Sequence, residues 1–113
     1  MHHLSAEERK RVKVAEGLHA IELFEDTVMT VAETEIDGRF PRDGQLSNQV
    51  CKEIVVVLAS DGGSVELNGE RSPLQAGECV TIPTDSKICW HGPLRLLAIC
   101  TPPWYAEQHI IDA

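Results

Sequence analysis

The chain has 113 residues, of which 42% are hydrophobic and 25% are charged, and its formal net charge is −8. This length and composition predict one globular domain, residues 1–113, with a single hydrophobic core, and exclude an intrinsically disordered chain. The acidic balance argues against nucleic-acid and anionic-membrane partners, because both require a basic surface.

No window approaches the roughly 20 consecutive apolar residues of a membrane span, and no apolar signal-peptide core follows the N-terminal charges. We therefore expect a cytoplasmic protein without a membrane partner. Four cysteines are present, and none of them forms a Cys-x-x-Cys pair; they are Cys51, Cys79, Cys89 and Cys100. In the cytoplasm they are expected to remain thiols.

The N-terminal segment, residues 1–11, predicts one short helical turn. Ser5 and Glu8 have the spacing of a capping box, and the turn is expected to run through Glu7 to Arg11. Most of these side chains are charged, which is typical of a solvated face.

Residues 12–101 predict strands. Short runs of β-branched and aliphatic residues are broken by turn signals about every ten residues, a pattern typical of an all-β sandwich or barrel. The expected strands are residues 18–24, 27–36, 46–52, 53–60, 64–68, 70–74, 78–83, 87–91 and 94–101.

Two local signals fix particular turns. Asn68-Gly69 predicts a two-residue type I′ hairpin, because both positions of that turn need a positive φ. Pro102 and Pro103 end the last strand, since proline withholds a ladder donor. The C-terminal tail, residues 102–113, is expected to pack back over the barrel from Trp104 onward.

Several of these positions agree with one family. The stretch from Glu53 to Pro83 combines an aliphatic strand, the Asn-Gly hairpin, a turn over residues 74–78 and a second strand, with Gly77 at a fixed interval before Pro83. In these features the chain resembles the two conserved motifs of the cupin superfamily, and its ending, residues 100–104, is similar to the close of many small single-domain cupins. The resemblance implies an all-β, cupin-type double-stranded β-helix, a jelly-roll barrel, over residues 12–101.

The resemblance also implies where a metal would be held. Cupins usually supply three histidines and a glutamate, and the matching positions here are Ser47, Gln49, Glu53 and Ile88. Only the glutamate is a good ligand, so we expect no metal and no other cofactor. An atypical metal site with Cys51 and Glu53 remains an alternative, because Cys51 shares the alternation of Ser47 and Gln49 along a regular strand.

The histidines do not replace the missing ligands. If Ile88 and Trp90 face inward, the pleat turns Cys89 and His91 outward, and His91 is expected on the surface or the rim. The other histidines lack a ligand spacing; they are His2, His3, His19 and His109.

The candidate ligand-binding residues inside the barrel are Ser47, Gln49, Cys51, Glu53, Ile88 and Trp90. Burial in an apolar barrel would raise the pKa of Glu53, which makes it the candidate catalytic acid or base. The structural alternative is a Glu53 that is hydrogen-bonded by Gln49, Asn48 or Lys52. Trp90, together with Trp104 and Tyr105, could form flat walls for a ring-bearing or sugar-like ligand; packing in an aromatic core is the alternative.

Three functions remain open at this point. The favoured one is a metal-free barrel that binds an unknown small organic molecule. The second is an enzyme of the isomerase or cyclase type that uses Glu53, or one that uses the atypical site with Cys51. The third is a filled barrel that acts through its surface or as a dimer. Because small cupins often pair through sheet edges or exchanged N-terminal strands, the resemblance implies a homodimer formed through residues 12–36.

Overall fold

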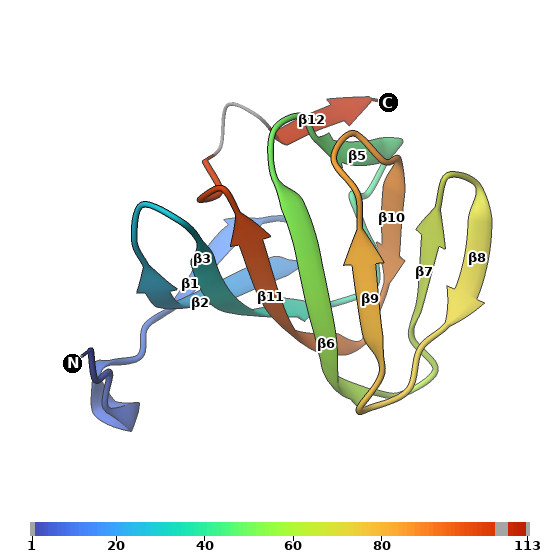
Figure 1. The fold of residues 1–113 in the computed structure, drawn as a ribbon. Helices are drawn as coiled ribbons and strands as arrows, with labels where there is room; N and C mark the ends of the chain where they lie inside the picture. The colour runs from blue at the N-terminus through green and yellow to red at the C-terminus, as the bar shows by residue number, and fades with distance from the viewer. Residues whose placement is uncertain (1, 106–108, 113) are drawn as a thin grey trace.

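Two antiparallel sheets face each other and enclose the core in the computed structural model, which describes residues 2–105 and 109–112 (Figure 1). The first sheet contains, in spatial order, β1 (Arg11–Ala15), β2 (Leu18–Glu25), β3 (Thr30–Ile36), β11 (Leu94–Thr101), β6 (Lys52–Ser60) and β9 (Cys79–Ile82). The second contains β12 (His109–Asp112), β5 (Gln45–Asn48), β10 (Ile88–His91), β7 (Ser64–Leu67) and β8 (Glu70–Pro73), and β4 (Arg39–Phe40) pairs with β10. The expected all-β barrel is confirmed.

The pleat of β6 and β11 builds the inner wall of the first sheet. On β11 every second side chain is buried, namely Leu94, Leu96, Ala98 and Cys100. On β6 the buried pair Val55 and Val57 has the same alternation as Glu53, and the antiparallel register places Glu53 opposite Cys100. Alternation therefore directs Glu53 toward the interior.

The hairpin between β7 and β8 has the predicted geometry. Asn68 and Gly69 have φ angles of 51° and 86°, and Leu67 pairs with Glu70 across the turn. Asparagine and glycine are the residues that adopt these left-handed conformations at the lowest cost.

Two elements differ from the sequence-based expectation. The strand expected over residues 46–52 is interrupted, because β5 ends at Asn48 and β6 begins at Lys52 with bends at residues 49 and 50 between them. At the N-terminus the helical turn is a 3₁₀ turn, Ala6–Glu8, which ends before Arg11 because Arg11 begins β1. Within this turn the backbone N–H of Ser5 donates to Glu8 Oε1 at 3.4 Å.

Three strands, β1, β4 and β12, were not expected. β1 forms the outer edge of the first sheet, and β12 pairs antiparallel with β5 along the top of the molecule (Figure 1). The pairing of β12 returns the C-terminal tail to the barrel as expected, although residues 106–108 and 113 of that tail lie outside the described residues. In the described part of the chain, no helix is long and apolar enough to cross a membrane.

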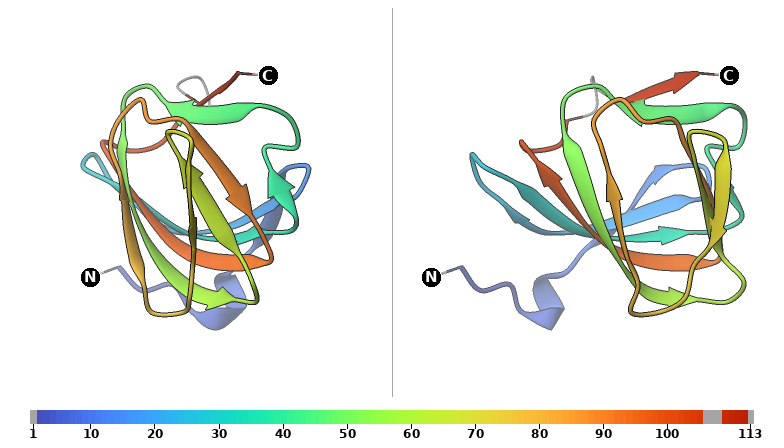
Figure 2. Two further views of the ribbon diagram at one scale, coloured as in Figure 1. Left: turned by 90° about the vertical axis from the view of Figure 1, so that its right-hand side faces the viewer. Right: turned by 45° about the vertical axis from the view of Figure 1, so that its right-hand side comes forward.

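The β2–β3 hairpin extends past the rest of the barrel. Figure 2 shows the β2–β3 hairpin projecting beyond β6 and β11, while the segment before β1 lies outside the barrel. The core cluster, which includes Phe40, Val65, Ile82 and Ile88, lies between the two sheets.

Candidate ligand-binding cavity

A cavity of about 350 Å³ lies between the two sheets. This volume is within the range of small-molecule sites in proteins. Its apolar walls come from both sheets and include Leu18, Ile36, Phe40, Leu46, Leu96 and Ala98. Its polar groups are fewer and are supplied by Glu22, Glu25, Thr30, Thr34, Asn48, Glu53 and Cys100.

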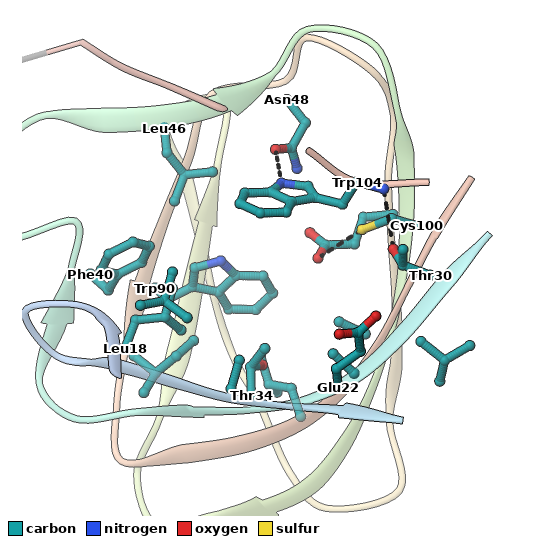
Figure 3. Close-up of a pocket in the computed structure, with 18 of the residues that line it drawn as sticks. Leu18, Glu22, Thr30, Thr34, Phe40, Leu46, Asn48, Trp90, Cys100 and Trp104 are labelled. Carbon is teal, nitrogen blue, oxygen red and sulfur yellow. Dashed lines mark hydrogen bonds between the residues drawn. The ribbon is translucent and has the colours of Figure 1, made fainter. Parts of the chain in front are cut away.

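Both tryptophans of the chain line this cavity. Trp90 reaches it from β10, and Trp104 reaches it from the segment after β11 (Figure 3). Trp104 is held at two points, because its indole Nε1 donates to Asn48 Oδ1 at 3.1 Å and its backbone N–H donates to Thr30 Oγ1 at 3.2 Å. The tryptophan walls expected from the sequence are therefore present, whereas Tyr105 is exposed and lies outside the lining.

Glu53 is the acid that lies deepest in this apolar environment. Burial disfavours its charged form and raises its pKa to about 7, while a hydrogen bond from Cys100 acts in the opposite direction. The Cys100 thiol donates to Glu53 Oε2 at 3.7 Å. A carboxyl group with this pKa exchanges its proton close to neutral pH, which is the property required of a general acid or base.

The Cys100 thiol beside Glu53 stays protonated. A hydrogen bond with Cys51 and burial together hold the pKa of Cys100 far above its usual range. Cys51 is itself buried and does not line the cavity. Cys100 therefore offers Glu53 a neutral hydrogen-bond donor rather than a nucleophilic thiolate.

The ionisable side chains that line the cavity are acidic. Three glutamates line it, and no lysine, arginine or histidine among the described residues does so. An anionic ligand would find no counter-charge here, whereas a neutral or cationic one would meet carboxylates and aromatic faces.

Of the six predicted binding residues, the structure brings Glu53 and Trp90 to the cavity wall. The expectation that Ser47 and Gln49 point into the barrel does not hold, because Leu46 and Asn48 occupy the inner face of β5. Gln49 instead donates to Asp85 Oδ1 at 2.8 Å and to Ser47 Oγ at 3.3 Å.

The break after β5 is the reason for this difference. The bends at residues 49 and 50 shift the alternation by one residue, so Gln49 and Glu53, which a single regular strand would carry on one face, do not both face the cavity. Ile88 and Cys51 do face the interior, but both are fully buried in the packing and lie outside the cavity lining.

The sequence reading missed some cavity residues and could have found one of them. Cys100 follows from the alternation of Leu94, Leu96 and Ala98 along a correctly predicted strand. Asn48 was considered only as a partner of Glu53, and it bonds Trp104 instead. Phe40 lies on a strand of two residues, which is too short to give a periodic signal.

No protein-family model and no curated protein sequence matches the chain. A variant of Pac13 from Streptomyces, solved with uridine, matches 100% of this chain and 92% of its own, with a TM-score of 0.85 and 18% identity; Pac13 is a nucleoside dehydratase. An RmlC-like cupin from Shewanella frigidimarina covers 90% of this chain and 91% of its own, with a TM-score of 0.76 and 16% identity.

The chain has the cupin fold. A further structure with this fold, a protein from Planctomyces limnophilus, covers 96% of this chain and 95% of its own at a TM-score of 0.83 and 23% identity.

The residues of this cupin barrel do not fit the metal that the fold usually holds. Ser47 and Gln49 stay off the cavity wall, and Ile88 has no donor atom. The alternative site with Cys51 and Glu53 also lacks support. Among the described residues, the ligand atoms of histidine, cysteine and acidic side chains gather in threes within 4.8 Å at one place only, and neither Cys51 nor Glu53 belongs to it.

Proposed function

We propose that the barrel binds a small, ring-bearing organic molecule that carries no negative charge. The observation that carries this proposal is the cavity itself, in which two tryptophans and one carboxyl group with a pKa of about 7 share an apolar space of about 350 Å³. Apolar walls with a few placed polar groups are typical of small-molecule sites.

Aromatic walls and carboxylates together define the class of ligand. Indole faces pack against flat rings and attract cations, and the hydroxyls of Thr30 and Thr34 with the Asn48 amide offer neutral hydrogen bonds. A phosphate or carboxylate on the ligand would be repelled by Glu22, Glu25 and Glu53 without compensation. A neutral nucleoside such as uridine, the ligand of the Pac13 variant, has the required chemistry.

Intrinsic fluorescence tests this proposal directly, because the only two tryptophans of the chain both line the cavity. The probes do not emit in the tryptophan band: they are uridine, nicotinamide and the cation 1-methylnicotinamide, each paired with an anionic relative, which is uridine monophosphate for the first and nicotinate for the other two. We expect at least one neutral or cationic probe to change the emission saturably, and its anionic relative to bind at least tenfold more weakly.

The variant Glu53→Gln separates charge from shape in the same titration. It keeps the size of the side chain and removes its charge, so the discrimination against the anionic probe should shrink. As a matched control, Glu78→Gln changes an exposed glutamate outside the cavity and should leave the titration unchanged. No saturable response to any neutral or cationic probe, or equal binding of the anionic relatives, would contradict the proposal.

A second function is favoured by one comparison, the full-length likeness to a nucleoside dehydratase. In this alternative the Glu53 carboxylate takes a proton from a carbon next to an activating group. The bond from the neighbouring carbon to its hydroxyl then breaks, and Glu53 returns the proton to the departing oxygen. The products are an alkene and water, and the carboxylate is regenerated. The same acid and base role would serve an isomerase or a cyclase.

Kinetics distinguish this enzyme from a binding module. Turnover of a probe that binds should require the ionised carboxyl, so the rate should rise with pH around 7. Glu53→Gln should abolish turnover while the probe still quenches tryptophan emission. Turnover that persists in Glu53→Gln would remove Glu53 from this role, and bound probes without any turnover would leave the binding function.

A further inference from the structure

The outer face of the second sheet carries a cluster that is separate from the cavity. Cys89 and His91 stand two residues apart on β10, so both lie on the face opposite to that of Ile88 and Trp90. Cys89 is fully buried there, and His91 is partly exposed. Glu66 lies opposite Cys89 on the neighbouring strand β7. The pleat therefore places a thiol, an imidazole and a carboxylate on one face, where β10 and β7 run side by side (Figure 1).

The ligand atoms of this cluster lie slightly farther apart than they would around a bound metal ion. Cys89 Sγ lies 3.7 Å from His91 Nε2, and His91 Nε2 lies 3.7 Å from Glu66 Oε2. All three ligand atoms lie within 4.8 Å of one another. Tetrahedral zinc with bonds of about 2.0–2.3 Å needs ligand atoms about 3.3–3.6 Å apart, so closure requires only a modest contraction around the ion.

We propose that Glu66, Cys89 and His91 form a binding site for a zinc-class divalent ion on the outer face of the second sheet. Thiolate, imidazole and carboxylate are the three side-chain donors that zinc accepts, and a water molecule would complete the tetrahedron. His91 and Glu66 are partly exposed, with side-chain exposures of 20% and 30%, so an ion can approach from solvent.

Two arginines modulate this site. Burial raises the pKa of the Cys89 thiol, and the nearby Glu66 carboxylate adds to this effect, whereas the charges of Arg39 and Arg71 oppose it. A bound ion would therefore have to displace the thiol proton. The guanidinium groups of the two arginines are engaged elsewhere: Arg71 Nε donates to Ser64 Oγ at 2.9 Å, and Arg39 donates to two backbone carbonyls. Since their charge also repels a cation, we expect weaker binding than in a closed four-ligand zinc site.

Titration of the metal-free protein tests the proposal. The chain should carry His2→Asn and His3→Asn, because the terminal histidines would otherwise compete for metal. Zinc is titrated against a chromophoric chelator, and cobalt is added separately because a cobalt–thiolate bond produces a charge-transfer band in the near ultraviolet. We expect one equivalent of each ion and a thiolate band with cobalt.

Variants assign the site to its residues. Cys89→Ser should abolish the cobalt–thiolate band, and His91→Gln and Glu66→Gln should each weaken zinc binding at least tenfold. Cys79→Ser is the matched control, because Cys79 is an exposed cysteine outside the cluster, and it should change nothing.

The opposite outcomes are equally clear. Absence of a stoichiometric ion at micromolar zinc, or a thiolate band that survives in Cys89→Ser, would overturn the proposal. His91→Gln alters a partly exposed side chain and should leave the circular dichroism unchanged, so a loss of binding in that variant cannot be assigned to misfolding. Glu53→Gln should leave zinc binding intact, which keeps this test independent of the function proposed for the cavity.

Discussion

At the scale of single residues, Glu53 is the most unusual group in the molecule. On the inner face of the barrel, burial removes the water that would stabilise the ionised Glu53 carboxylate. The thiol of Cys100 replaces that water with only a weak hydrogen bond. The residue therefore has a cost to stability that depends on pH, and this cost is measurable without knowing the ligand.

Glu53 should make the protein less stable as pH rises. Its folded-state pKa of about 7 lies above the ordinary value of 4.5. Between these values the folded state holds a proton that the unfolded state has released, so the stabilisation present below about pH 4.5 is lost as the pH passes through 7. The linkage relation gives roughly 2–3 kcal/mol of lost stability between pH 5 and pH 8.

Urea unfolding at both pH values tests this prediction. The free energy of unfolding of Glu53→Gln should not contain this pH-dependent decrease. Relative to the wild type, the variant should therefore become more stable by roughly 2–3 kcal/mol between pH 5 and pH 8. The control is Glu78→Gln, whose pH dependence should follow that of the wild type. Parallel pH profiles for Glu53→Gln and wild type would show that Glu53 is well solvated.

At the scale of elements, the strands with clear periodicity were predictable and the irregular joints were not. The strand over residues 94–101 is an apolar run between turn signals and has the predicted bounds in β11, where every second side chain is buried. The Asn68-Gly69 turn follows from its φ requirements. The joint between β5 and β6 has no comparable signal, and it decided which of residues 46–49 face inward. Of the six candidate residues, Glu53 and Trp90 therefore reach the cavity, Ser47 and Gln49 are displaced by the bends, and Cys51 and Ile88 are buried outside the lining.

Gly92, in the turn between β10 and β11, is the glycine where an added side chain would be least tolerated. Its backbone N–H donates to the carbonyl of Gly38 at 2.6 Å. A Cβ placed on it would lie 2.1 Å from the carbonyl oxygen of Ile36. Gly92→Ala must therefore move backbone against backbone, and we expect a loss of about 3 kcal/mol in the free energy of unfolding.

Thermal unfolding measures this prediction against a second glycine. Gly69→Ala introduces a Cβ that meets nothing within 4 Å and costs only the left-handed backbone conformation, about 1 kcal/mol. The midpoint of Gly92→Ala should lie below that of Gly69→Ala by roughly 10 °C. Equal midpoints would mean that the β10–β11 turn can relax away from β3.

At the scale of the whole molecule, the exposed edge of the first sheet is the feature that a partner would cover. β1 is the outermost strand, and its Val12 and Val14 are 57% and 47% exposed. An open edge with apolar side chains invites pairing with another chain. We propose a homodimer in which the β1 edges of two copies pair, as the sequence led us to expect.

Light scattering at micromolar concentration tests this pairing. The wild type should have twice the chain mass of 12.5 kDa. Val12→Lys places a charge on the edge and should shift the population to the single-chain mass, whereas Val28→Lys changes an equally exposed valine away from β1 and should not. A wild type at the single-chain mass would exclude the dimer.

Trp104 forms hydrogen bonds to both sheets of the barrel. Its backbone N–H is bonded to Thr30 on β3 in the first sheet, and its indole is bonded to Asn48 on β5 in the second. A molecule that stacks on this indole therefore tethers both layers at once. Occupancy should slow hydrogen–deuterium exchange in β3 and β5 together, even though these strands belong to different sheets.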